Sequence, residues 1–213
     1  MILTIGLCLG LGAGIAFAAG FEDVGENDWF RDAVEYACDK GIMRGVTETA
    51  FEPDSDVDRT TLVTALYNYS VVKGFDVSVG EDTNILSYED AFDIREGAYE
   101  AFQWACGSGL IPEEGATRLE PDEVVSREQM VMLLFDYAVL YGIDATAGED
   151  TNILSYEDVF EIAVDEAYAA FQWACGSGVI VGTTDSTLSP SANATRAQLA
   201  TVMMRLSAKE RMS

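Results

Sequence analysis

The sequence contains no histidine among its 213 residues, which removes the side chain that most often acts as general base or metal ligand. Basic residues are scarce: 12 Lys and Arg stand against 37 Asp and Glu, for a formal net charge of −25. This charge argues against binding to nucleic acid or to anionic membrane surfaces. Any anionic ligand must be held by local positive groups. The hydrophobic fraction of 49% is that of a globular protein.

Cysteine is sparse as well, with four residues. One of them lies in the apolar run over residues 2–15, which is followed by small residues at 16 and 18. This pattern is typical of a secretory signal over residues 1–19, and predicts a secreted protein with no stable membrane span in its mature form. The other three take the same place in a repeat, an odd number that argues against a disulfide framework and favours small buried side chains: Cys38, Cys106 and Cys175.

The sequence is rich in internal repetition. Residues 80–90 recur without change at 148–158, and residues 101–109 recur at 170–178. A more divergent first copy aligns through Tyr36-Ala37-Cys38 and Phe51-Glu52-Pro53. We therefore expect three units after the signal, over residues 20–77, 78–145 and 146–213.

Each unit has the same order of motifs. An aromatic-x-Asp element opens it, a helical segment follows that ends in Tyr-Ala or Trp-Ala, and an apolar-x-Pro element leads into a second helix. The pattern predicts an all-α protein of three helix–loop–helix units. We expect Tyr36, Trp104 and Trp173 to pack between the two helices of their own unit.

A capped arginine motif opens each second helix. The three copies are Asp58-Arg59-Thr60-Thr61, Ser126-Arg127-Glu128-Gln129 and Thr195-Arg196-Ala197-Gln198. Ser or Thr is a good N-cap, and Gln three residues later completes a capping box. A cation in the first turn opposes the helix dipole, so helix stability does not explain the arginine. Two explanations stand equally: an anion held by the guanidinium and free backbone N–H groups, or a bridge to a carboxylate of a neighbouring repeat.

These motifs in this order resemble the S-layer homology domain. The resemblance rests on the aromatic-x-Asp starts, the Trp or Tyr helices, the Gly-apolar pairs that follow them, the apolar-x-Pro elements and the arginine motifs. It covers nearly all of residues 20–213, and it implies a three-pronged spindle in which the second helices gather near a pseudo-threefold axis.

The resemblance also implies a ligand: a secondary cell-wall polysaccharide with a ketal-linked pyruvate, bound in grooves between units where the motif arginine meets the acid. The positions that carry over are Arg59, Arg127 and Arg196. We expect the site of Arg196 to be the best preserved, because Asp58 stands beside Arg59 and Glu113-Glu114 stand in the second unit.

A second group of positions is expected to contribute less to the ligand site. Trp29 is either a core residue or a platform for a sugar ring. Gly45 and Gly182 leave room for a sugar to approach the backbone, and Gln198 belongs to the best-preserved motif. The opening aspartates either accept hydrogen bonds from sugar hydroxyls or, as we favour, cap the following helix: Asp23, Asp90 and Asp158.

The predicted function is noncatalytic anchoring at the cell wall or S-layer, with wall polysaccharide as partner and neither cofactor nor metal. Other envelope proteins are further candidate partners. The alternative is a degenerate S-layer homology protein that acts as an envelope interaction subunit without polysaccharide binding. Acidic residues would allow a glycoside-hydrolase carboxylate pair, but the sequence has no acidic cluster outside the repeated pattern, so we do not expect an enzyme.

Overall fold

The computed structural model describes residues 20–80, 83–111, 115–146, 148 and 151–209. The predicted secretory signal over residues 1–19 lies outside this part of the chain. The described helices are α1 (Arg31–Asp39), α2 (Arg59–Lys73), α3 (Tyr99–Gly107), α4 (Arg127–Leu140), α5 (Asp165–Gly176) and α6 (Arg196–Lys209). Four 3₁₀ turns join them: η1 (Ile85–Ser87), η2 (Ala91–Asp93), η3 (Ile153–Ser155) and η4 (Val159–Glu161). The expected all-α class is confirmed.

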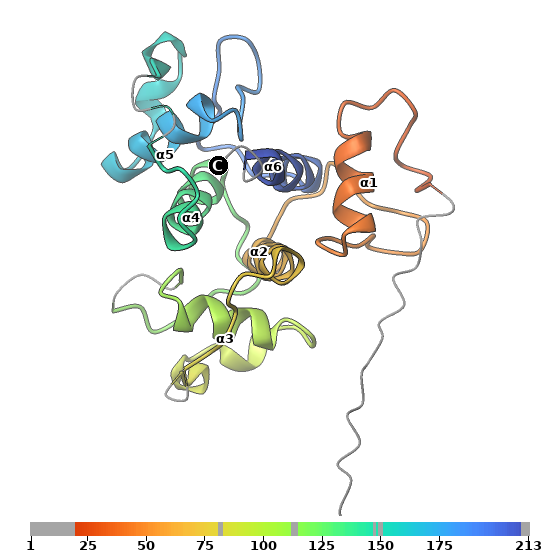
Figure 1. Cartoon of the computed structure of the whole chain (residues 1–213), viewed down its shortest axis with the longest axis vertical. Helices are drawn as coiled ribbons and strands as arrows, with labels where there is room; N and C mark the ends of the chain where they lie inside the picture. Colours follow the sequence, from red (N-terminus) through yellow and green to blue (C-terminus); the bar gives the residue numbers. More distant parts are fainter. Residues whose placement is uncertain (1–19, 81–82, 112–114, 147, 149–150, 210–213) are drawn as a thin grey trace, which may run out of the picture.

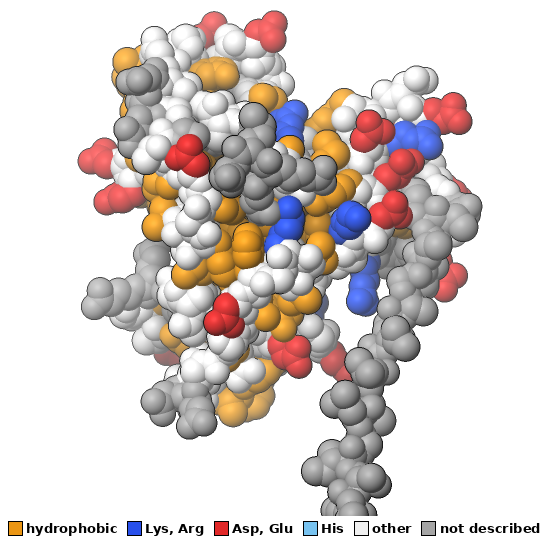
Figure 2. Space-filling model, in the orientation of Figure 1, with side chains coloured by type: hydrophobic (Ala, Val, Ile, Leu, Met, Phe, Trp, Pro, Cys, Tyr) orange, Lys and Arg blue, Asp and Glu red, His pale blue; other side chains and the backbone are white. Residues whose placement is uncertain are grey.

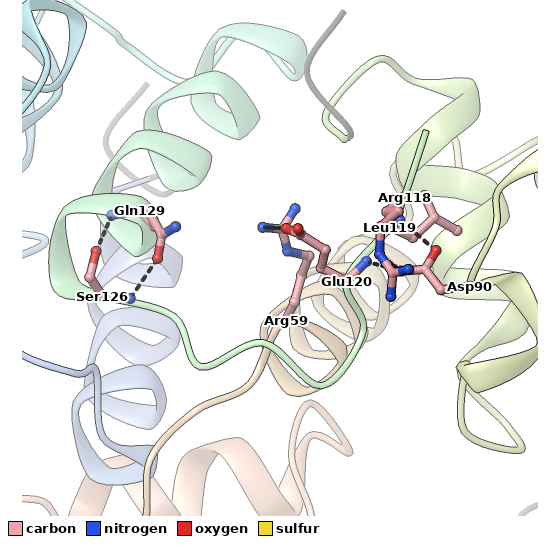
Figure 3. Close-up of polar contacts among 7 residues, drawn as sticks. All are labelled: Arg59, Asp90, Arg118, Leu119, Glu120, Ser126 and Gln129. Atoms are coloured by element: carbon pink, nitrogen blue, oxygen red, sulfur yellow. Dashed lines mark hydrogen bonds and ion pairs between the residues drawn. The ribbon is translucent and has the colours of Figure 1, made fainter. Parts of the chain in front are cut away.

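The second helices begin where the motifs predict. In α4, Ser126 Oγ accepts from the Gln129 backbone N–H at 3.1 Å, and Gln129 Oε1 accepts from the Ser126 N–H at 2.8 Å (Figure 3). Thr195 and Gln198 make the same reciprocal pair before α6. At α2 only half of the box forms, because Asp58 caps the helix but Thr61 cannot reach back.

Helix packing crosses from one repeat to the next. The pairs in closest contact are α2 with α3, α4 with α5, and α1 with α6. Figure 1 shows α2, α4 and α6 in the middle of the molecule with α1, α3 and α5 outside them. The expectation that each aromatic packs within its own unit is wrong for Trp173, whose ring lies 5.6 Å from Phe135 of α4. Trp104 contacts both Tyr67 of α2 and Tyr137 of α4.

The cause is the extended segment before each second helix, which bonds to the other units. Val57 N–H donates to the Ala194 carbonyl at 2.8 Å, Ala194 N–H to the Val125 carbonyl at 2.9 Å, and Val125 N–H to the Val57 carbonyl at 2.8 Å. The three bonds form a closed ring, and all three residues are buried. These bonds place the start of each second helix against a neighbouring unit.

Candidate functional site

The arginine motifs lie at junctions between repeats, and their backbone N–H groups are occupied. Arg127 N–H donates to the Ala192 carbonyl at 2.8 Å, and Glu128 N–H to the Pro190 carbonyl at 3.0 Å. The corresponding amides of α2 and α6 bond in the same way to the second and first repeats. The hypothesis that free N–H groups at these helix starts hold an anion is therefore wrong.

The guanidinium of Arg127 is also occupied. Its Nε donates to the Leu188 carbonyl at 2.9 Å and its Nη2 to the Val181 carbonyl at 3.3 Å. Only 3% of the residue is exposed. Burial lowers the pKa of this guanidinium, and the neighbouring Cys175 and Asp158 raise it in part. Arg127 fastens the third repeat's loop to the second repeat.

Arg196 does the same for the first repeat. Its Nε donates to the Phe51 carbonyl at 2.8 Å and its Nη2 to the Arg44 carbonyl at 2.7 Å. The guanidinium also lies over the Phe51 ring, 4.6 Å from the centroid, an arrangement that favours a cation. The prediction that Arg196 binds a ligand is untested by these contacts, which show a structural role.

Arg59 departs from this pattern. Its Nη2 pairs with Glu120 Oε2 at 3.2 Å (Figure 3). This is the bridge to a carboxylate of a neighbouring repeat that the sequence allowed as one of two explanations.

The opening aspartates hold the apolar-x-Pro loops and do not cap helices. Asp90 Oδ1 accepts from Leu119 N–H at 2.7 Å and Oδ2 from Glu120 N–H at 2.8 Å (Figure 3). Asp23 and Asp158 accept from the equivalent amides of their units. None of the three caps a helix through its side chain, so the favoured capping role is wrong; the sugar-binding role stays a prediction.

The middle residue of each apolar-x-Pro element has a left-handed backbone, which sequence reasoning missed. The φ angles are 56° at Glu52, 51° at Glu120 and 53° at Ser189. Such a conformation is strained for a residue with a side chain. The sequence signal for this conformation was the proline that follows the position in each repeat, together with the aspartate that opens each unit.

The two predicted glycines are explained by packing inside their own units. A Cβ at Gly45 would lie 2.5 Å from a ring carbon of Phe21, and one at Gly182 would lie 2.9 Å from Tyr156 and 2.4 Å from the Thr184 carbonyl oxygen. The glycines let the opening aromatic pack against the loop backbone.

Four of the predicted site residues meet in one groove of about 380 Å³. They are Trp29, Arg127, Gly182 and Gln198. The remaining lining residues come from the loop after α5 and from α6: Ile180, Val181, Thr183, Thr201, Val202 and Arg205. On the face drawn in Figure 2, Lys and Arg side chains gather in the middle, and acidic side chains lie mostly toward the edges.

The other predicted residues do not line this groove. Arg59, Arg196, Gly45 and the three aspartates lie at other positions of the repeats. Sequence reasoning also missed Thr183, Thr201 and Arg205. The signal for Arg205 was available, because it is the only arginine at the ninth position after a motif arginine, where α2 has Asn68 and α4 has Asp136.

A second hollow of about 280 Å³ lies in the third repeat, against Leu154, Phe160 and Tyr168. Phe160 also lines this hollow, and the residue is 88% exposed. Phe92, 85% exposed, lies two residues after the first copy of the exact repeat, as Phe160 does after the second. The residues that line the hollow of the third repeat are mostly apolar and include no basic side chain.

The three cysteines of the described residues are free thiols at equivalent, half-buried positions. Burial raises the pKa of Cys38, Cys106 and Cys175 to about 11. Among the described residues, no group of three or more Cys, Asp or Glu side chains is arranged to hold a metal ion. No helix in the described ranges is both long and apolar enough to cross a membrane.

Two regions of the chain, residues 20–60 and 155–200, match the family model of the S-layer homology domain. Within these two regions the resemblance of the sequence motifs to the S-layer homology domain is confirmed. The boundaries of the three units, and the middle unit over residues 78–145, stay predictions from internal repetition.

The chain is similar to parts of several bacterial proteins. It is 26% identical over 189 residues to an amylopullulanase of Thermoanaerobacterium thermosulfurigenes, a match that covers 86% of this chain and 9% of the relative. It is 26% identical to exoglucanase XynX of Acetivibrio thermocellus, over 86% of this chain and 16% of the relative. It is 25% identical to the surface-layer 125 kDa protein of Lysinibacillus sphaericus, over 61% of this chain and 10% of the relative.

The chain therefore spans at most about a sixth of the length of these relatives. The S-layer homology domain is a module for anchoring at the cell surface, and residues 20–60 and 155–200 are the parts of this chain that match it. The catalytic names of two relatives belong to proteins several times longer, and do not extend to this chain.

Proposed function

We propose that the protein attaches to the cell surface by binding an anionic, pyruvylated secondary cell-wall polysaccharide in the groove between α6 and residues 180–183. The observation that carries the proposal is the make-up of this groove. It combines an aromatic side chain, arginine, an amide and hydroxyl groups in a chain of net charge −25. Such a mixture suits a sugar with an acidic substituent.

Trp29 supplies the apolar part of the contact. The residue is 66% exposed, whereas Trp104 and Trp173 are buried. An indole ring offers a large flat surface on which the apolar face of a sugar ring can stack. Trp29 belongs to the first repeat and the opposite wall to the third, so the ligand would join two repeats.

The proposed binding is noncatalytic. Among the described residues, those that line the groove include no Asp or Glu. Hydrolysis of a glycosidic bond by the usual mechanism requires a pair of carboxyl groups beside the bond. The groove is therefore suited to hold a polysaccharide without cleaving it.

The test is co-sedimentation with purified wall sacculi, before and after chemical removal of the secondary polymer. We expect the wild-type protein to pellet with intact sacculi and to stay in solution with stripped ones. Trp29→Ala should bind markedly less. Phe160→Ala is the matched control, because it removes an exposed aromatic side chain outside the groove, and it should bind as the wild type does.

A separate observation supports the alternative of an envelope interaction subunit. Phe92 and Phe160 are large apolar side chains exposed at equivalent places in two repeats, and exposed apolar surface of this kind often marks protein contacts. If the wild type stays in solution with intact sacculi as well, the polysaccharide proposal fails and this alternative gains.

A further inference from the structure

The two arginines of the groove differ in what they bind. The guanidinium of Arg127 donates hydrogen bonds to the carbonyls of Leu188 and Val181. Arg205 lies half-buried in the groove wall and has no hydrogen bond or ion pair within the part of the chain that the structure describes. A cation left unpaired in a groove is available to an external anion.

The groove also holds an amide with donors to spare. Gln198 uses its side-chain oxygen to accept from Thr195 N–H at 3.3 Å. Its side-chain NH₂ group has no hydrogen-bond partner among the described residues. This group can therefore donate to a sugar hydroxyl or to a carboxylate. Arg205 and Gln198 lie on the same helix, seven residues or about two turns apart.

The other repeats have neither an arginine at the position of Arg205 nor an aromatic residue at the position of Trp29. At the Arg205 position α2 has Asn68, whose amide already donates to the Ile42 carbonyl at 3.1 Å. α4 has Asp136 there, which is an acid. At the Trp29 position, nine residues before the repeated cysteine, the second repeat has Gly97 and the third has Glu166. Near α4, which packs on α5, Glu166 therefore adds a second acid to Asp136. Near α2, which packs on α3, Gly97 offers no aromatic side chain.

We infer that Arg205 binds the carboxylate of the ligand and that, within the described residues, the groove beside α6 is the one polysaccharide site. The motif arginine Arg127 is a positioning residue, which holds the 181–188 loop in place as the wall of the groove. Trp29 receives the sugar ring, and the Gln198 NH₂ group donates to it. This inference rests on the proposed function and assigns the binding of the ligand carboxylate to one side chain, Arg205, in that groove.

The experiment uses two probes: the methyl glycoside of N-acetylmannosamine carrying a ketal-linked pyruvate, and the same glycoside without the ketal. Binding is followed by calorimetry and by tryptophan fluorescence. Because Trp104 and Trp173 are buried, a fluorescence change reports mainly on Trp29. The variants are Arg205→Ala, Arg205→Lys and the control Arg44→Ala, which removes an exposed arginine whose side chain does not line the groove.

We expect the wild type and Arg44→Ala to prefer the pyruvylated sugar by at least about tenfold, since a charge-assisted pair is at stake. Arg205→Ala should bind both sugars alike, with an unchanged melting temperature. Arg205→Lys should recover part of the preference, because lysine keeps the charge but loses the two-pronged geometry. Loss of preference without loss of stability is a result that a purely structural role would not give.

A preference that survives in Arg205→Ala would overturn the inference and leave the proposed function standing. A wild type that binds the two sugars equally would overturn the assignment of a carboxylate to this groove. If the wild type binds neither sugar nor intact sacculi, the proposed function fails and the inference with it.

Discussion

The carboxylate of Asp158 holds the backbone of Ser189 in a left-handed conformation. Its Oδ2 accepts from Ser189 N–H at 2.7 Å, and its Oδ1 accepts from Leu188 N–H at 2.8 Å. The φ angle of Ser189 is 53°. The Leu188 carbonyl is in turn the acceptor for Arg127 Nε. An aspartate of the third repeat and an arginine of the second therefore fix the same loop, which is one wall of the groove.

Replacing this aspartate should destabilise the protein. Asp158→Ala removes a charged acceptor from two part-buried N–H groups, and we expect a loss of about 1.5–3 kcal/mol in the free energy of unfolding. Urea unfolding measures it. Asp185→Ala is the matched control, because Asp185 is exposed in the same loop, and it should change stability by less than about 0.5 kcal/mol. Equal losses in both variants would contradict the role given to Asp158.

The equivalent Asp90 should make stability depend on acid pH. Burial raises its pKa, but the Leu119 and Glu120 N–H groups and nearby Arg118 outweigh burial, so the pKa lies below the ordinary value. Its stabilising contribution is therefore complete above the unfolded pKa of about 3.9 and is lost as pH falls through the folded pKa. The stability gap between wild type and Asp90→Asn should shrink below about pH 4 in urea titrations. A gap that stays constant down to pH 2 would refute this.

The left-handed residue before each proline should prefer glycine. At Glu52, with φ of 56°, a side chain strains the backbone. We expect Glu52→Gly to be neutral or stabilising and Glu52→Val to cost about 1–2 kcal/mol. Thermal unfolding of the two variants gives the comparison. Glu22→Gly, at a position without positive φ, should only lose stability.

Replacing Arg127 should destabilise the protein, whereas replacing Arg205 should leave its stability nearly unchanged. Arg127→Ala leaves two carbonyls without their charged donor in a buried site, and should cost about 2–3 kcal/mol or more. Arg127→Lys should not restore it, since an ammonium cannot match the guanidinium fork. Arg205→Ala should stay within about 0.5 kcal/mol of wild type. Denaturant midpoints for the three variants test this contrast, and a large loss for Arg205→Ala would count against its free state.

The thiols should react slowly while the protein is folded. Burial raises the pKa of Cys38, Cys106 and Cys175 to about 11 from 9.0. At pH 8 the thiolate fraction is then roughly a hundredfold lower than for an ordinary thiol. Alkylation at pH 8, located by mass spectrometry of peptides, should be slow in the native protein and fast in urea. Fast labelling of any of the three in the native state would show a lower pKa at that site.

Much of the fold followed from local patterns. The capping boxes of Ser126 and Thr195 and the helical spacing after them are determined by residues three or four apart, which a sequence displays directly. The partner of each helix was not predictable in this way. Trp173 packs on Phe135 of the preceding repeat because the extended segments cross over, and that choice depends on contacts between distant residues.

The site was predicted in part for the same reason. Trp29, Arg127, Gly182 and Gln198 were singled out by sequence and meet in one groove. The role of Arg127 depends on which carbonyls surround it, and no local pattern shows them. Arg205 stood outside every motif, and only a comparison of equivalent helix positions sets it apart from Asn68 and Asp136.

The contact between α1 and α6 has a kinetic consequence. Among the described helices the first, α1, packs against the last, α6, so α1 lacks this partner until about 165 further residues have been synthesised. Pairing across such a sequence separation is slow. The waiting helix is open to aggregation in that interval. We therefore expect α1 to reach its final packing only after α6 has emerged.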